Sequence, residues 1–245
     1  MKKKLISKTI KIGSLKNSQI DEMFKLFEIF YENVSYARFK SDLLAKTKVI
    51  ILLDFEKKIQ GFSTFYDFDF PFQDKTARVL FSGDTIIAPD YWGTSALTME
   101  FLKNMIILKL KYPLRPVWWF LISKGYKTYL LLANNFLDYY PRYDKVTPKE
   151  ESSLIASLSE KFYPGKFNID SGVIEFEANE HEHLKEYIAP ITDELMKKYP
   201  KIKFFNSKNP GWKKGDELAC IGEVNPLLGI VHPWKIFKKI IKFKK

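Results

Sequence analysis

The sequence contains very little cysteine and histidine: one Cys and three His occur among 245 residues. A single cysteine excludes an intramolecular disulfide framework and is typical of a reducing compartment. His181 and His183 are two residues apart, a spacing that on a helix points the two imidazoles in different directions. We therefore expect no metal centre, and we interpret Cys220, which lies in an apolar strand pattern, as a buried small hydrophobic residue.

Long apolar runs are also absent from the sequence. The most apolar stretches, near 105–110 and 117–122, are broken or flanked by Lys109, Lys111 and Arg115. None approaches the roughly 20 apolar residues that span a bilayer. The basic start, MKKKLISKTIKIGS, lacks the apolar core of a secretory signal. The sequence therefore predicts a cytoplasmic protein, either soluble or held peripherally on the inner face of a membrane.

Acidic residues are missing from residue 225 to the end of the chain. Residues 233–245, PWKIFKKIIKFKK, would place apolar residues on one broad side of a helix and lysines mostly on the other. This pattern is typical of a basic amphipathic helix in a membrane interface, and the alternatives are docking on the domain or binding an acidic carrier protein. The net charge of +11 favours an anionic partner, but no nucleic-acid-binding motif is present, so nucleic acid is not expected.

What the sequence does contain is the composition of a globular protein, with 46% hydrophobic and 28% charged residues. Aromatic residues make up 16%. Most of them are expected in the core, and a surplus could also line a groove for an apolar ligand. We find no internal repeat and no low-complexity linker. One domain over 1–232, elaborated at its C-terminal end, and a tail over 233–245 are expected.

Hydrophobic periodicity predicts the element order β-α-α-β-β-β-α-β-α up to residue 143. After residue 143 the pattern is more polar, with two further helices and two further strands. The expected strands cover 5–12, 48–54, 62–70, 77–88, 117–123, 172–177 and 218–224. The expected helices cover 17–31, 36–47, 96–111, 126–136, 149–162 and 181–198, the last of them interrupted or bent at Pro190.

The pattern of residues 75–111 predicts a strand, a polar turn and a long helix. Gly83 interrupts the strand pattern, which often marks a bulge or a close approach to the backbone. Pro89 ends the strand, and Thr94 or Ser95 can cap the helix that follows. The free amides at a helix start attract anions and carbonyl groups. The stretch is therefore either a cradle for a cofactor or acyl donor, or an ordinary strand-to-helix connection.

The element order, with the segment IIAPDYWG (86–93) at its centre, resembles the GNAT superfamily of N-acyltransferases. The segment is similar to the family's fourth strand and to the start of its pantetheine and pyrophosphate loop. The resemblance covers 5–143, with a further strand pair near 172–224. It implies an α/β (α+β) fold: a mixed, mostly antiparallel central sheet with helices on both faces.

The family's activity implies transfer of an acyl group, here expected to be a fatty acyl group, from a thioester to an amine. The donor would be acyl-CoA or a phosphopantetheine-linked acyl group on acyl carrier protein, and neither is a tightly bound cofactor. The acceptor would be a small molecule or a peptide. Donor-binding residues are expected at Ile86, Ile87, Ala88, Trp92, Gly93, Thr94, Ser95 and Asn135.

The loop departs from the family pattern R/Q-x-x-G-x-G/A, which aligns here with 92–97. Trp92 stands at the Arg/Gln position, and Ser95 and Leu97 stand at the positions of small residues that let amides close around a pyrophosphate. Two interpretations follow. The donor is presented by a carrier protein without the nucleotide, or the chain is a non-catalytic GNAT-like binding module that associates with a membrane or another anionic partner.

The resemblance also implies catalytic roles. Asp84 lies where many family members have a general base, and its alternative role is to accept turn amides at the Gly83 bulge. The backbone N–H of Ile87 or Ala88 would polarise the thioester carbonyl. Tyr139 or Tyr140 would protonate the departing thiolate, unless these rings simply pack at a helix end.

Overall fold

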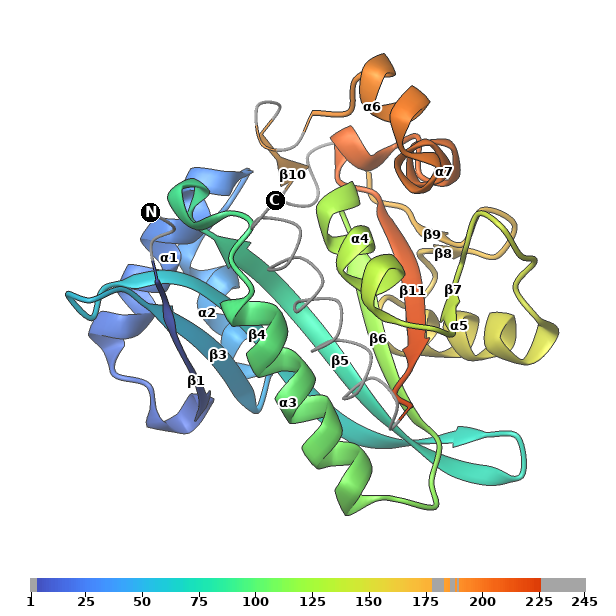
Figure 1. The fold of residues 1–245 in the computed structure, drawn as a ribbon, viewed down its shortest axis with the longest axis horizontal. Helices are drawn as coiled ribbons and strands as arrows, with labels where there is room; N and C mark the ends of the chain where they lie inside the picture. The colour runs from blue at the N-terminus through green and yellow to red at the C-terminus, as the bar shows by residue number, and fades with distance from the viewer. Residues whose placement is uncertain (1–3, 178–182, 186–187, 189, 226–245) are drawn as a thin grey trace, which may run out of the picture.

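The computed structural model describes residues 4–177, 183–185, 188 and 190–225. Its centre is a sheet in the strand order β1-β3-β4-β5-β6-β11-β9-β8, with β7 paired to β11 (Figure 1). Neighbouring strands are antiparallel except for β5 and β6, which are parallel. The strands are β1 Ile6–Lys11, β3 Lys48–Leu53, β4 Ile59–Phe72, β5 Lys75–Ile87, β6 Val117–Ser123, β7 Tyr139–Tyr140, β8 Phe167–Asn168, β9 Val173–Ile174 and β11 Glu217–Glu223.

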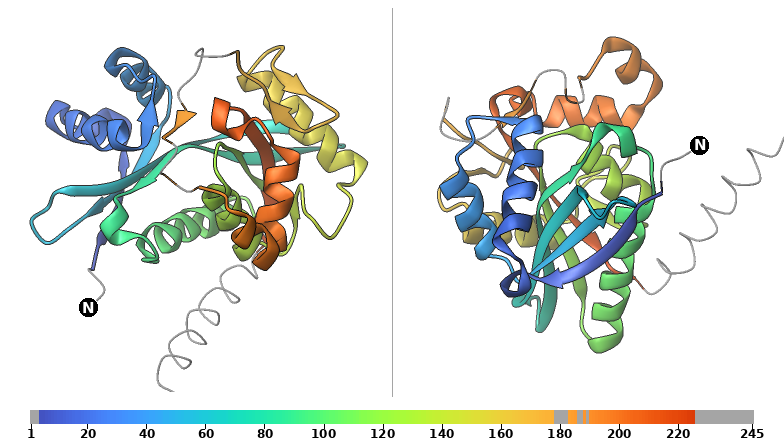
Figure 2. Two further views of the ribbon diagram at one scale, coloured as in Figure 1. Left: turned by 90° about the horizontal axis from the view of Figure 1, so that it is seen from above. Right: turned by 90° about the vertical axis from the view of Figure 1, so that its left-hand side faces the viewer.

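Helices cover both faces of the sheet, as Figure 2 shows from above. On one face α3 (Ala96–Lys111) and α4 (Tyr126–Asn135) pack on the sheet, with α7 (Pro200–Lys208) against α4. On the other face α1 (Asn17–Phe30) and α2 (Tyr36–Leu44) cover one half, and α5 (Lys149–Phe162) covers the other half. The predicted mixed, mostly antiparallel sheet with helices on both faces is confirmed.

Aromatic contacts show which residues face which layer. Phe65 of β4 contacts Phe101 of α3 at a centroid distance of 5.7 Å, whereas Phe62 contacts Phe39 of α2 at 6.1 Å on the opposite face. The run 49–52 in β3 is fully buried, as expected for a strand covered on both faces. The apolar and aromatic content of the chain is therefore used mainly to join three layers.

One predicted helix is wrong in part. The sequence pattern predicts a helix over 181–198, but His183–Leu184 forms strand β10, which pairs with β2 (Tyr31–Glu32). The helix in this region, α6 (Asp193–Lys198), starts only after Thr192, whose hydroxyl accepts a hydrogen bond from Leu195 N–H. Proline at 190 explains the delay, since it cannot donate within a helix. His181 and the tail 233–245 lie outside the described residues.

The parallel pair β5–β6 is short and then divides. Its register runs from Arg78↔Val117 to Ser82↔Leu121. Beyond that point β5 continues along β4, with Thr85 opposite Ser63, while β6 continues along β11. The sheet therefore opens at the carboxyl ends of its parallel strands, where α3 also begins. Within the described residues, no helix is both long and apolar enough to cross a bilayer.

Candidate active site

A cleft of about 790 Å³ occupies the opening between β5 and β6. Two groups of side chains line it, and we name them by the nearest helix. The α3 side contains Thr94, Leu97 and Thr98 of the β5–α3 connection and helix, with Thr128 and Leu131 of α4. The α5 side contains Lys46, Phe81, Phe162, Tyr163, Lys166 and Phe176. Asp84 of β5 also lines the cleft, so ligands that approach from opposite faces of the sheet can meet beside it.

Asp84 lies at a β-bulge. The register with β4 passes from Phe65↔Ser82 to Ser63↔Thr85, so β5 carries one more residue than β4 in this interval. Gly83 makes the bulge possible, because a Cβ at this position would lie 2.7 Å from Thr64 Oγ1 and 3.2 Å from Lys46 Cε. The bulge and glycine predicted from the sequence are thus present, and Asp84 is partly buried at the cleft wall.

Beyond the bulge, the edge of β5 that points away from β4 faces the cleft. Ala88 N–H donates to Gln60 O at 2.8 Å, so Ala88 faces β4. Groups on successive residues of a strand alternate in direction, which turns the N–H and C=O of Ile87 away from β4. The indole of Trp92 donates to Ile87 O at 2.7 Å, consistent with this orientation. Two backbone N–H groups were expected to polarise the thioester carbonyl. That of Ile87 has the required direction, and that of Ala88 does not, because it is hydrogen-bonded to β4.

The connection into α3 leaves donors uncapped at the cleft. Ser95 occupies the N-cap position, but its side chain makes no capping hydrogen bond, contrary to the prediction for Thr94 or Ser95. Thr94 Oγ1 is buried and has no hydrogen-bond partner among the described residues. Gly93 has φ 77°, a left-handed value that favours glycine. Leu97 is 3% exposed and packs in the core while it also lines the cleft.

Trp92 joins the β5–α3 connection to α4. Its ring lies under the ammonium of Lys127 at the start of α4, with Nζ 3.3 Å from the ring centroid. Burial of this ammonium lowers the pKa of Lys127, although the residue as a whole is exposed. Trp92, which aligns with the Arg/Gln position of the family pattern, therefore contacts α4 and joins the loop to that helix.

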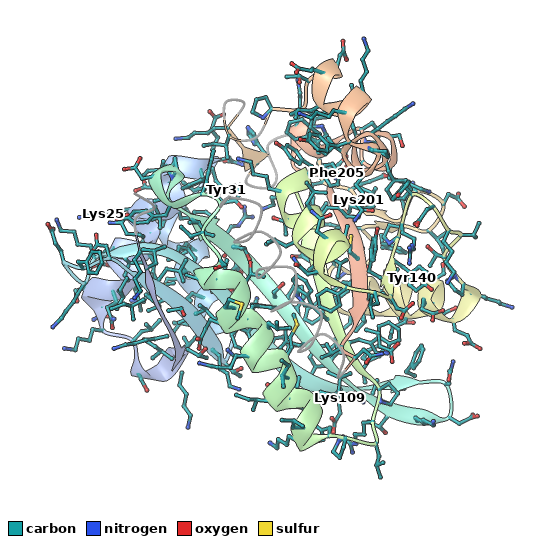
Figure 3. All side chains as sticks on the ribbon, in the orientation of Figure 1. Lys25, Tyr31, Lys109, Tyr140, Lys201 and Phe205 are labelled. Carbon is teal, nitrogen blue, oxygen red and sulfur yellow. The ribbon has the colours of Figure 1, made fainter. Side chains whose placement is uncertain are left out.

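The two predicted tyrosine acids do not line the cleft. Tyr139 and Tyr140 form β7, pair with β11 and are buried, at 3% and 4% exposed. Tyr139 packs against Tyr129, and burial raises its pKa. Figure 3 shows Tyr140 beyond β11, in the half of the sheet that α5 covers, whereas Tyr31 lies in the half that α1 and α2 cover. This corrects the prediction that either tyrosine protonates the leaving thiolate, because neither reaches the bulge.

Asn135 lines a smaller chamber of about 40 Å³ rather than the main cleft. Its amide donates to Leu131 O at 2.6 Å. The chamber, which we call the apolar pouch, shares Thr85, Leu97, Thr98 and Leu131 with the cleft. Its remaining wall is mainly apolar, from Phe101, Leu102, Met105, Trp119 and Phe136. The predicted donor-binding residues thus divide between the cleft (Ile86, Ile87, Trp92, Gly93 and Thr94) and the pouch (Asn135), while Ala88 and Ser95 line neither.

Sequence reasoning missed the charged and aromatic residues of the α5 side and an ion pair elsewhere in the cleft wall. Lys124 and Glu217 form an ion pair at 3.6 Å in the cleft wall, with side chains only 10% and 4% exposed. Lys124 directly follows β6 and Glu217 begins β11, almost 100 residues later, and no local pattern indicates that pairing. No group of three or more potential metal ligands occurs in the part of the chain that the structure describes.

No protein-family model and no curated protein matches the sequence. Solved structures with weak similarity include a GNAT-family N-acetyltransferase from Escherichia coli in complex with CoA, at TM-score 0.38 and 15% identity, covering 54% of this chain and 72% of that chain. A predicted acetyltransferase with acetyl-CoA from Clostridium acetobutylicum gives TM-score 0.35 and 11% identity, covering 46% and 79%.

A third similar structure is a probable N-acyltransferase from Enterococcus faecalis, at TM-score 0.38 and 19% identity. The match covers 52% of this chain and spans only 31% of that chain. These neighbours are described as members of the GNAT family or as acyltransferases. All three TM-scores lie below 0.5.

Proposed function

We propose that the protein is an N-acyltransferase that moves an acyl group from a thioester to an amine. The observation that carries this proposal is the opening of the sheet at a bulge that holds a carboxylate. A thioester that enters from the α3 side and an amine that enters from the α5 side reach Asp84 and the Ile87 amide together. Bringing two reactants into contact in this way supplies a large part of a catalysed rate.

The chemistry requires one proton acceptor and one carbonyl-polarising donor. Asp84 takes a proton from the ammonium form of the acceptor, directly or through water. The free amine then attacks the thioester carbonyl, while the N–H of Ile87 stabilises the oxyanion. The C–N bond forms, the C–S bond breaks, the thiolate leaves with the excess proton from the attacking nitrogen, and Asp84 returns its proton to solvent. No tyrosine in β7 takes part in this sequence.

The donor-binding groups fit a pantetheine thioester, which acyl-CoA and acyl carrier protein share. The part of β5 that no longer pairs with β6 can pair with pantetheine amides, as an extended ligand pairs with a free sheet edge. The uncapped start of α3, with the buried hydroxyl of Thr94, offers donors to an anionic group. The acyl group points toward the apolar pouch. A fatty chain exceeds about 40 Å³ and would continue along the main cleft.

Turnover with a panel of acyl-CoA and acyl-carrier-protein thioesters from C2 to C16, in the presence of a pool of amines, tests the proposal. Thiol release is measurable with a thiol reagent because the single cysteine, Cys220, is fully buried. Intact-mass and product spectra identify the amide. Turnover with carrier-bound chains but not with CoA esters favours the carrier donor. Absence of turnover with every donor overturns the enzyme and favours a non-catalytic binding module.

Peripheral membrane association through residues 233–245 is a separate part of the proposal, based on sequence alone. Each lysine at an anionic surface adds up to about 1 kcal/mol of binding. Co-sedimentation with anionic and neutral vesicles tests it. Binding to anionic vesicles that is lost on deletion of 233–245 supports membrane association, and equal binding by the full and shortened chains contradicts it.

A further inference from the structure

The α5 side of the cleft combines aromatic rings with lysine ammonium groups. Lys46 Nζ lies 5.4 Å from the ring centroid of Phe81, and Lys166 Nζ lies 5.1 Å from that of Phe176. Both rings and both lysines line the cleft. Cations on aromatic faces are held in place by attraction to the ring. The α5 side therefore presents fixed positive charge against flat apolar surfaces.

Lys46 is the cation next to the bulge. Its Nζ lies 4.0 Å from the Cβ position of Gly83, the residue before Asp84. The side chain is partly buried, and no carboxylate of the described residues lies within 4.0 Å of Nζ. A partly buried ammonium without a carboxylate partner is stabilised by an anionic ligand. The position of Lys46 thus predicts that the molecule that binds beside Asp84 carries a negative charge.

The neighbouring aromatic surface has the shape for a ring. Phe162 stacks on Phe81 at a centroid distance of 4.3 Å with an interplanar angle of 20°, and Tyr163 meets Phe176 edge-to-face at 5.7 Å. All four residues line the cleft: Phe162 and Tyr163 at the end of α5, Phe81 in β5 and Phe176 just after β9. A planar apolar group gains most from such surfaces, through offset stacking or edge contacts.

We propose that the acyl acceptor is an aromatic α-amino acid, whose carboxylate binds Lys46 and whose ring packs against Phe162 and Phe176. This inference rests on the proposed function for the fate of the amine, although the binding site stands without it. In an α-amino acid one carbon separates the amine from the carboxylate. A carboxylate on Lys46 therefore leaves the amine beside Asp84, since Lys46 lies over the residue that precedes Asp84.

Binding without a donor is the first test, measured by calorimetry on the full chain with and without CoA. The ligands are phenylalanine, phenethylamine, which lacks the carboxylate, and alanine, which lacks the ring. Phenylalanine should bind most tightly, and Lys46→Met should weaken its binding about ten-fold or more while abolishing the preference over phenethylamine. Lys48→Met is the matched control, because Lys48 also lies over a ring, at 5.8 Å from Phe65, but does not line the cleft.

The results separate this inference from the proposed function. Turnover of other amines with no preference for phenylalanine or tyrosine overturns the acceptor class and leaves the acyltransferase in place. Lys46-dependent binding of phenylalanine without turnover supports the acceptor site and contradicts the acyltransferase. Equal loss of binding in Lys46→Met and Lys48→Met, or no binding and no turnover of any aromatic amino acid, overturns the acceptor site.

Discussion

At the scale of single residues, the site depends on a one-residue excess in β5. The bulge at Gly83 removes Asp84 from the regular alternation of the strand and places it in the cleft wall. Without the extra residue, the side chains beyond it would exchange faces. Ile87 would then turn toward β4, and the cleft would lose both groups that the proposed reaction uses.

Asp84→Asn should lower kcat by about 10²–10⁴-fold, the usual contribution of a general base. The amide keeps the size of the side chain but cannot take a proton from the acceptor. Steady-state kinetics and thermal unfolding of both proteins provide the measurement. Asp74→Asn, at the exposed turn between β4 and β5, is the control. Full activity in Asp84→Asn shows that Asp84 only accepts hydrogen bonds in the turn.

At the scale of elements, the long β4–β5 hairpin is fixed by one arginine. Arg78 donates to Asp67 Oδ2 from Nε at 2.8 Å and to Asp69 Oδ1 from Nη1 at 2.9 Å. Its guanidinium also lies 5.2 Å from the ring centroid of Tyr112, just after α3. The hairpin is thereby tied to the end of the helix whose start lines the cleft.

Arg78→Met should lower the free energy of unfolding by about 1.5–3 kcal/mol, as for the loss of hydrogen bonds to charged groups. It also leaves the largely buried Asp67 carboxylate with only the distant Lys48, at 3.9 Å. Urea unfolding measures the change. Arg115→Met removes a more exposed partner of Asp69 and should cost less than about 1 kcal/mol. Equal effects of the two changes contradict a special role for Arg78.

A second link between elements joins β1 to α3 through Glu100. The carboxylate accepts hydrogen bonds from Thr9 at 2.7 Å and Ser7 at 3.3 Å and pairs with Lys103 at 2.7 Å. Burial by itself raises the pKa of Glu100, but hydrogen bonds from Lys103 and Thr9 outweigh it, so the pKa lies below its usual value. A carboxylate with this shift stabilises the fold only while it is ionised.

The stabilisation from Glu100 should be fully present above the unfolded-state pKa of about 4.3 and be lost as the pH falls through the lower folded-state pKa. Glu100→Gln should therefore destabilise the protein at pH 7 and destabilise it less at about pH 4, just below the unfolded-state pKa. Unfolding curves at the two pH values test the sign. A loss of the same size at both values shows that shape, not charge, is what Glu100 contributes.

At the scale of the whole molecule, the cleft requires that α4 lie close to β11. Gly222 allows this approach, because a Cβ there would lie 2.5 Å from Leu132 Cδ1 and 2.7 Å from Phe136 Cδ1. Both side chains belong to the buried core between the sheet and α4. The distance between these layers also sets the position of Thr128 and Leu131, which line the α3 side of the cleft.

Gly222→Ala should cost about 1–3 kcal/mol through overpacking and should also change the apparent affinity for the acyl donor. Thermal unfolding and donor titration measure the two effects. Gly13→Ala is the matched control, because no atom lies within 4 Å of a Cβ at that position. An unchanged stability for Gly222→Ala would show that α4 moves away without cost.

The sequence indicated the part of the site that lies on one continuous stretch. Gly83, Asp84 and the start of α3 are local, so a glycine in a strand pattern and a proline turn were enough to find them. Tyr139 and Tyr140 were misassigned because their burial depends on pairing with β11, some 80 residues later. Lys46 and Phe162 were missed because they are far apart in the sequence. They come together only in the folded protein, where the end of α2 lies beside the end of α5.

The position of β11 has a consequence for the synthesis of the protein. Residues 217–223 lie between β6 and β9 in the sheet, although both neighbours come much earlier in the chain. A nascent chain that has not reached residue 217 leaves the apolar strand VWWFLIS with one unpaired edge, and such edges join other chains. The cleft therefore completes late in translation. A fragment that ends before residue 217 should aggregate when expressed, whereas the chain through residue 225 contains every strand of the central sheet that the structure describes.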